Sequence, residues 1–179
     1  DVSIAMVGKY TDLSDAYLSV IKSLQHAAMK VRRKLTIKWI EASHLEEQWQ
    51  NNNVKEYTIA WDTLRSSDGV LVPGGFGDRG IEGKVNAAQY ARENKIPYLG
   101  ICLGLQVATI EFCRNVLGIS GANSTEFDDN VEYPAVIFMP EISKTHLGGT
   151  MRLGSRPTIW QVNDCKIKRL YGQGDSVDE

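Results

Sequence analysis

The sequence has 179 residues, of which 42% are hydrophobic and 23% charged, and its net charge is -2. These values are typical of one soluble globular domain, and the nearly balanced charge gives no general attraction to nucleic acid or anionic membranes. No apolar run reaches the roughly 18 residues that a membrane helix needs, and no signal-peptide pattern opens the sequence. We therefore expect a cytoplasmic protein without nucleic-acid or membrane partners. The three cysteines share no metal-ligand spacing, so we expect free thiols and no metal site.

Strand and helix patterns alternate through the first two thirds of the chain. Short apolar runs between glycine or proline, and one alternating run, predict strands at residues 3–7, 35–40, 70–72 and 98–101. Apolar residues at three- and four-residue steps, with polar helix starts, predict helices at residues 17–31, 54–65, 81–94 and 103–117. This order predicts an α/β fold with a parallel or mixed sheet covered by helices on both faces. Ligands of such sheets bind beyond the carboxyl ends of the strands.

The last third of the chain is less periodic. Strands are expected at residues 131–138 and 158–162, and a helix at 165–171. We find no repeat, low-complexity tract or clear linker, so we expect a single domain over residues 1–179.

A cysteine stands between two glycines in GICLG, residues 100–104, after a predicted strand and before a predicted helix. This is the cysteine form of the GxSxG nucleophile elbow, in which small neighbours allow a nucleophile to occupy a tight turn. The helix start would direct unpaired N–H groups and a positive dipole end at the sulfur, which favours the thiolate. A buried structural cysteine is the alternative. It remains our interpretation for Cys113 and Cys165, whereas Cys102 is expected to be a nucleophile.

The glycine-rich run VPGGFGDRG, residues 72–80, follows the preceding strand and so reaches the same edge of the sheet. A thiolate that attacks an amide needs N–H donors for the developing oxyanion, and Leu103, directly after the nucleophile, offers one. The glycines can present others, while a flexible turn is the alternative. A phosphate-binding loop does not fit, because GDRGIEGKV lacks the GxxxxGK spacing and has valine after its lysine.

Together these motifs resemble the class I (triad) glutamine amidotransferases. The strings GGFGDRGIEGK, RENKIPYLGICLGLQ, ANSTEF and LGGTMRLG resemble, more narrowly, the glutaminase domain of the CTP synthase family, and the similarity runs from VGKY to RLYG. The resemblance implies a flavodoxin-like domain that hydrolyses L-glutamine without a cofactor. It further implies a synthetase domain, absent here, that uses the ammonia with ATP and Mg to aminate UTP to CTP in a homo-oligomer.

The resemblance also assigns roles to residues. Cys102 would form a γ-glutamyl thioester, and the N–H groups of Gly75 and Leu103 would hold the oxyanion. Glu126 would pair with the α-ammonium of glutamine, although its position alone suggests a solvated loop charge. Thr150 and Arg152 resemble residues linked to activation by GTP, with a structural role of Arg152 as the alternative. The residues expected to line the glutamine site are Gly75, Phe76, Leu103, Gly104, Leu105, Gln106 and Glu126.

The sequence departs from the family pattern at its end. The family completes its triad with a histidine and a glutamate downstream, and His26, His44 and His146 do not match that histidine. We therefore expect the domain to be incomplete at its carboxyl end and these 179 residues to be a weak or inactive glutaminase. A non-catalytic binding or assembly module of the same fold, and another cysteine hydrolase or redox sensor, are the alternatives.

Overall fold

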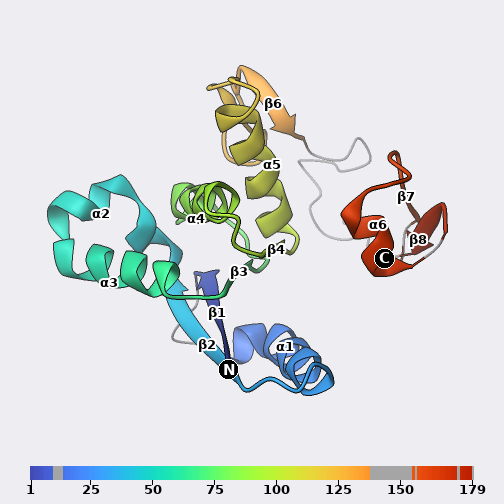
Figure 1. Cartoon of the computed structure of the whole chain (residues 1–179). Helices are drawn as coiled ribbons and strands as arrows, with labels where there is room; N and C mark the ends of the chain where they lie inside the picture. The colour runs from blue at the N-terminus through green and yellow to red at the C-terminus, as the bar shows by residue number, and fades with distance from the viewer. Residues whose placement is uncertain (10–13, 138–154, 156, 173, 179) are drawn as a thin grey trace. The chain divides into compact units, whose positions relative to one another are not determined.

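The computed structural model describes residues 1–9, 14–137, 155, 157–172 and 174–178 (Figure 1). Its contacts divide the chain into two compact units, Asp1–Ile137 and Phe138–Glu179. The expectation of one glutaminase domain over residues 1–179 stays a prediction. Each unit is described by itself below, and the candidate site lies in the first.

A four-stranded parallel sheet forms the centre of the first unit, with strand order β2-β1-β3-β4. The pairing of β3 with β4 places Val72 opposite Gly100, so the segments that follow these two strands leave the sheet at the same edge. The strands are β1 (Val2–Gly8), β2 (Leu35–Glu41), β3 (Gly69–Val72) and β4 (Tyr98–Gly100). All four predicted strands are confirmed to within a residue or two at each end.

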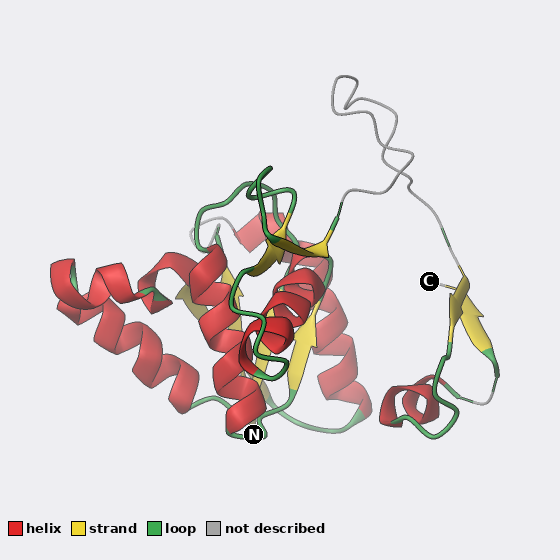
Figure 2. Cartoon of the chain, turned by 90° about the horizontal axis from the view of Figure 1, so that it is seen from above, coloured by secondary structure: helices red, strands yellow, loops and turns green. Residues whose placement is uncertain are grey.

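Helices cover both faces of this sheet, as expected (Figure 2). They are α1 (Leu18–Lys30), α2 (Glu47–Asn52), α3 (Val54–Arg65), α4 (Ile81–Glu93) and α5 (Leu103–Asn115), with short 3-10 turns at Ser14–Tyr17 and Ala42–Leu45. The short α2 was not predicted, because EQWQNN has neither an apolar period nor a cap. The amphipathic α3 occupies the predicted residues 54–65.

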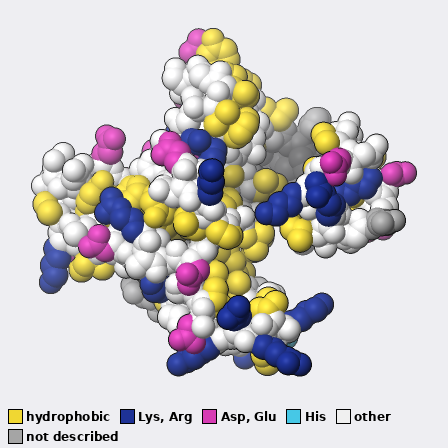
Figure 3. Space-filling view, in the orientation of Figure 1, with side chains coloured by type: hydrophobic (Ala, Val, Ile, Leu, Met, Phe, Trp, Pro, Cys, Tyr) yellow, Lys and Arg dark blue, Asp and Glu magenta, His cyan; other side chains and the backbone are white. Residues whose placement is uncertain are grey.

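The remaining elements are short. Two strands, β5 (Ala122–Ser124) and β6 (Tyr133–Val136), form a parallel pair in the first unit. The second unit contains β7 (Pro157–Ile159), α6 (Lys166–Tyr171) and β8 (Ser176–Asp178), with β7 antiparallel to β8. None of the helices in the described ranges is long and apolar enough to cross a membrane. On the face in Figure 3, acidic and basic side chains are interspersed, consistent with the balanced composition.

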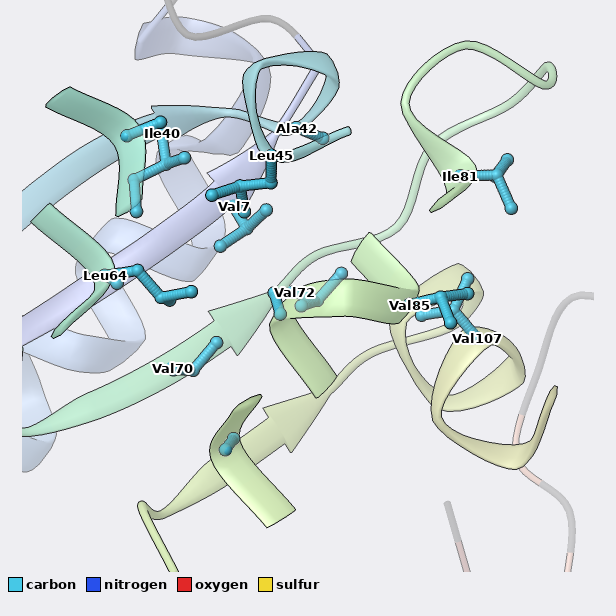
Figure 4. Packing of buried hydrophobic residues seen from close by; sticks show 14 of the residues in the cluster. Val7, Ile40, Ala42, Leu45, Leu64, Val70, Val72, Ile81, Val85 and Val107 are labelled. Carbon is cyan, nitrogen blue, oxygen red and sulfur yellow. The ribbon is translucent and has the colours of Figure 1, made fainter. Parts of the chain in front are cut away.

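Successive side chains along a strand point to opposite faces of the sheet, so the sheet separates two hydrophobic clusters. Ala5 and Val7 of β1 point into the larger cluster, which α3, α4 and α5 cover, and Figure 4 shows Val70 and Val72 of β3 in the same cluster. Met6, between Ala5 and Val7, packs with Leu71 and the residues of α1 on the other face. Burial on both faces explains why these strands read as continuous apolar runs.

The start of α5 packs directly on the sheet because two positions lack a side chain. A Cβ atom on Gly104 would overlap the carbonyl group of Val72, and one on Gly100 would overlap the carbonyl group of Gly104. The Tyr98 hydroxyl donates a hydrogen bond of 2.7 Å to the Gly104 carbonyl oxygen. Both glycines of GICLG are therefore needed for packing as well as for the turn.

The helices α4 and α5 are joined by an ion pair. Arg92 of α4 binds the carboxylate of Glu111 through Nε and Nη2, at distances of 2.7 to 3.0 Å. The Glu111 side chain is only 3% exposed, so this pair provides the charge that its carboxylate needs inside the protein. It fixes the spacing of the two helices whose first turns border the candidate site.

We expect Gly104→Ala to lower the free energy of unfolding by about 3 kcal/mol, because backbone on β3 blocks the added methyl group. Gly75→Ala is the matched control, since its Cβ would approach only the end of Lys84, at 4.0 Å, and it should change stability by less than about 1 kcal/mol. Urea unfolding of the two variants measures the difference. Equal stabilities would show that α5 can shift away from β3.

Candidate active site

Cys102 stands at the turn between β4 and α5 in a conformation that residues with a side chain rarely adopt. Its φ is 55° and its ψ is -109°. Two other non-glycine residues in the described ranges have positive φ, Arg32 and Lys95, but each directly follows the last turn of a helix, where left-handed residues are common. The strain at Cys102 has no such explanation and matches a nucleophile elbow.

The thiol is exposed, whereas the next residue, Leu103, is 2% exposed. The Cys102 carbonyl accepts hydrogen bonds from the N–H groups of Leu105 and Gln106, which closes the first turn of α5. Within the described ranges the N–H of Leu103 donates to no acceptor, as expected at a helix start. A free donor therefore lies next to the sulfur.

The glycine-rich loop after β3 reaches this cysteine. A Cβ atom on Gly74 would lie 3.3 Å from Cys102 Cβ and 3.7 Å from Sγ, so the backbone of the loop lies against the thiol. The N–H of Gly75 also has no acceptor among the described residues. The structure thus brings the loop at Gly74 against Cys102, and among the described residues the N–H groups of Leu103 and Gly75, the proposed oxyanion donors, have no acceptor.

Two buried lysines support the loop, and the sequence pattern did not identify either as part of the site. Lys9, directly after β1, is 4% exposed, and its Nζ donates to the carbonyl oxygens of Phe76, at 2.9 Å, and Gly77. Lys84, in the first turn of α4, is 1% exposed and reaches Gly75. The sequence gives little signal for Lys84, because a lysine in a polar stretch such as GDRGIEGKV shows no local sign that it will be buried.

Burial changes the acid–base properties of both lysines. Desolvation lowers the pKa of Lys9, with carboxylates including Asp78 and Glu126 opposing the shift. Desolvation, together with the positive charges of Lys9 and Arg79, lowers the pKa of Lys84 to about 8, while Glu41 acts in the opposite direction. Arg79 ties the cluster together, since its Nη2 donates to the Lys9 carbonyl at 2.6 Å and lies 3.8 Å from Glu41.

The other residues predicted to bind substrate differ in how exposed they are. Phe76 and Leu105 are 71% and 62% exposed, and Gln106 is partly buried beside Leu105. Glu126 is exposed on the turn after β5 and acts on Lys9, which places its charge on the side of the loop. Gly104 is buried in the contact with β3. Thr150, Arg152 and His146 lie outside the described residues.

No described residue supplies a base to the thiol. His26 is exposed on α1, and the ring of His44 packs on Trp49 with centroids 4.2 Å apart. Among the described residues no histidine hydrogen-bonds to Cys102, and no three His, Cys, Asp or Glu side chains cluster as metal ligands. The geometry can therefore hold a nucleophile and an oxyanion, and the described part of the chain leaves the proton transfers unassigned.

Comparison with known proteins places the chain in a class. A family model described as glutamine amidotransferase class-I matches residues 12–179, so the chain belongs to the class I glutamine amidotransferases, a family of enzymes. The narrower relationship is to CTP synthases. The chain is 58% identical to the CTP synthase of Eremothecium gossypii and 57% identical to that of Dictyostelium discoideum, in each case over 99% of the chain and 32% of the relative.

A solved structure supports the same relationship. It is described as the glutaminase domain of the Trypanosoma brucei CTPS with bound acivicin, and it matches with a TM-score of 0.86 and 38% identity over 100% of this chain and 65% of that one. The expected resemblance and the flavodoxin-like α/β fold are thus confirmed. The chain spans about a third of the length of the curated relatives that it matches.

The buried ammonium of Lys84 should make stability depend on pH. Its pKa is lower in the folded protein, about 8, than the ordinary value of 10.5, so the cost of burying the charge is fully present below pH 8. As pH rises from 8 to 10.5 the unfolded chain binds more protons, and stability increases by about 3 kcal/mol from this group. Lys84→Met should remove this increase and be more stable than the parent near pH 7.

Chemical unfolding of the parent and Lys84→Met at pH 7, 8, 9 and 10 measures this effect. Lys22→Met is the control, because Lys22 is exposed on α1. Parallel pH profiles for the parent and Lys84→Met would contradict the lowered pKa.

Proposed function

We propose that this domain hydrolyses L-glutamine through a thioester on Cys102. The observation that carries the proposal is the exposed cysteine with φ 55° at the start of α5, lying against Gly74 of the neighbouring loop. Membership of the class I glutamine amidotransferase family supports the reaction. The acivicin bound to the Trypanosoma brucei glutaminase domain supports a small-molecule site in a domain of this fold.

The chemistry follows from the positions of the donors. The thiolate attacks the side-chain carbonyl carbon of glutamine, and the oxygen, now negatively charged, accepts hydrogen bonds from the N–H groups of Gly75 and Leu103. With a proton delivered to the nitrogen by the downstream histidine that this proposal requires, collapse of this intermediate breaks the carbon–nitrogen bond, releases ammonia and leaves the γ-glutamyl thioester. Water then hydrolyses the thioester to glutamate. Glu126 would bind the α-ammonium group, and Phe76, Leu105 and Gln106 would line the pocket.

At the level of the whole protein we propose a CTP synthase. In this proposal the ammonia passes to a synthetase domain of the same parent chain, which uses ATP and Mg to aminate UTP in a homo-oligomer, with GTP as an activator at Thr150 and Arg152. The identity of more than 50% to CTP synthases over 99% of the chain supports this assignment. The reaction and the absence of a membrane-spanning helix in the described ranges are compatible with the proposed cytoplasmic location.

A glutamine-like chloroisoxazole tests the nucleophile. We expect one covalent adduct on Cys102, slowed at least tenfold by excess glutamine, because only this thiol is exposed next to oxyanion donors; Cys113 and Cys165 are partly buried. Mass spectrometry of the intact protein and its peptides identifies the site, and Cys102→Ser, which should form no adduct, is the control. Labelling spread over all three cysteines would favour a non-catalytic module or another thiol protein.

Turnover tests the missing base separately. Ammonia release should be weak for residues 1–179 and should rise by several orders of magnitude in a version extended through the downstream histidine and glutamate, since these groups would activate the thiol and protonate the leaving amine. An enzyme-coupled ammonia assay compares the two forms, with Cys102→Ser of the longer form as the blank. Equal rates would mean that a base lies within residues 1–179.

A further inference from the structure

Lys84 is a fully buried amine, and no counter-ion among the described residues contacts it. Its side chain is 1% exposed, and it is among the largest fully buried side chains of the described residues. Within those residues its Nζ has neither a hydrogen-bond acceptor nor a salt-bridge partner, since the nearby Glu41 lies beside Arg79 instead. Burying an unpaired ammonium destabilises a protein, so a lysine here requires a reason other than packing.

The position of this amine is specific. A Cβ atom on Gly75 would lie 4.0 Å from Lys84 Nζ, while one on the adjacent Gly74 would lie 3.7 Å from Cys102 Sγ. Two consecutive glycines of one loop therefore lie next to the thiol and the buried amine, respectively. Lys9 binds the next two carbonyl groups of the same loop, those of Phe76 and Gly77.

We propose that Lys84 is a positioning residue for glutamine hydrolysis, whose buried ammonium lies next to Gly75 and supplies positive charge behind the oxyanion donor. This inference rests on the proposed function of Cys102. Its charge sits in a water-poor environment, where its field on the Gly75 peptide is stronger than it would be at the surface. Negative charge that develops on the substrate oxygen beside Gly75 would then be stabilised without direct contact.

The charges around Lys84 make its contribution dependent on pH. Lys9 from the end of β1 and Arg79 from the loop before α4 disfavour its ammonium, whereas Glu41 from the end of β2 favours it. Glu46, which packs against the Gly83 position of α4, is a further carboxylate near this helix turn. The ammonium should therefore be present near pH 7 and lost above about pH 8.

The test compares two reagents on the same thiol. A chloromethyl ketone analogue of glutamine forms a carbon–sulfur bond and releases chloride, and its carbonyl oxygen must occupy the oxyanion position. Iodoacetamide needs only an accessible thiolate. Rates of Cys102 modification are measured by mass spectrometry from pH 6.5 to 9.5 for the parent, Lys84→Met, Lys84→Arg and the control Lys22→Met, with thermal unfolding of each variant in parallel.

At pH 7 we expect Lys84→Met to react about tenfold more slowly with the chloromethyl ketone and less than about twofold differently with iodoacetamide, while Lys22→Met reacts like the parent. Lys84→Arg should recover part of the rate because it keeps the charge. The ratio of the parent rate to that of Lys84→Met should fall toward one above pH 8, since the parent then loses its ammonium. Because both rates are measured with the same reagent on the same thiol at each pH, the titration of the thiol and of the reagent does not affect this ratio.

The proposal would be overturned if folded Lys84→Met reacted with the ketone as fast as the parent. It would also be overturned by equal slowing with both reagents, or by a ratio independent of pH, since Lys84 would then support only local packing. Failure of the proposed function looks different: the parent itself would then show no preference for the glutamine analogue at Cys102.

Discussion

The contact between the first turn of α5 and the carbonyl group of Val72 is the constraint on which the candidate site depends. Because Gly104 has no side chain, α5 begins directly on β3, and the chain must turn from β4 into the helix within two residues, Ile101 and Cys102. Cys102 directly precedes the helix, and its positive φ follows from the short distance available. The loop that continues from Val72 leaves the sheet beside this turn, so the same contact brings Gly74 against the thiol.

Positively charged side chains lie next to the glycine-rich loop after β3. Lys9 fixes two of its carbonyl groups, Arg79 binds the backbone of Lys9, and Lys84 reaches Gly75 without a partner of its own among the described residues. Two buried ammonium groups near one loop, those of Lys9 and Lys84, cost stability, and apolar side chains would avoid this cost. Such costs are common at functional sites, where a particular electrostatic environment matters more than the most stable packing.

The site combines rigid and adaptable parts. The residues that set the geometry, Gly100, Leu103 and Gly104, lie in close contact with the sheet. The residues expected to contact glutamine, among them Phe76 and Leu105, are exposed and can adjust to a ligand. The ion pair of Arg92 with Glu111 joins α4 and α5, the helices that follow the loop and the elbow.

Local sequence alone determined most of the fold and the tight turn at Cys102, because apolar periods and paired glycines act within a few residues. It predicted the four central strands, the helix at 54–65 and the elbow at Cys102, whereas α2 (EQWQNN), β5 (ANS) and β8 (SVD) have no apolar period or apolar run that would mark them. Only the tertiary structure decided that Lys9 and Lys84 meet at one loop. Their environment depends on burial by segments far apart in the chain, and a lysine in a polar stretch carries no local sign that water will be excluded from it.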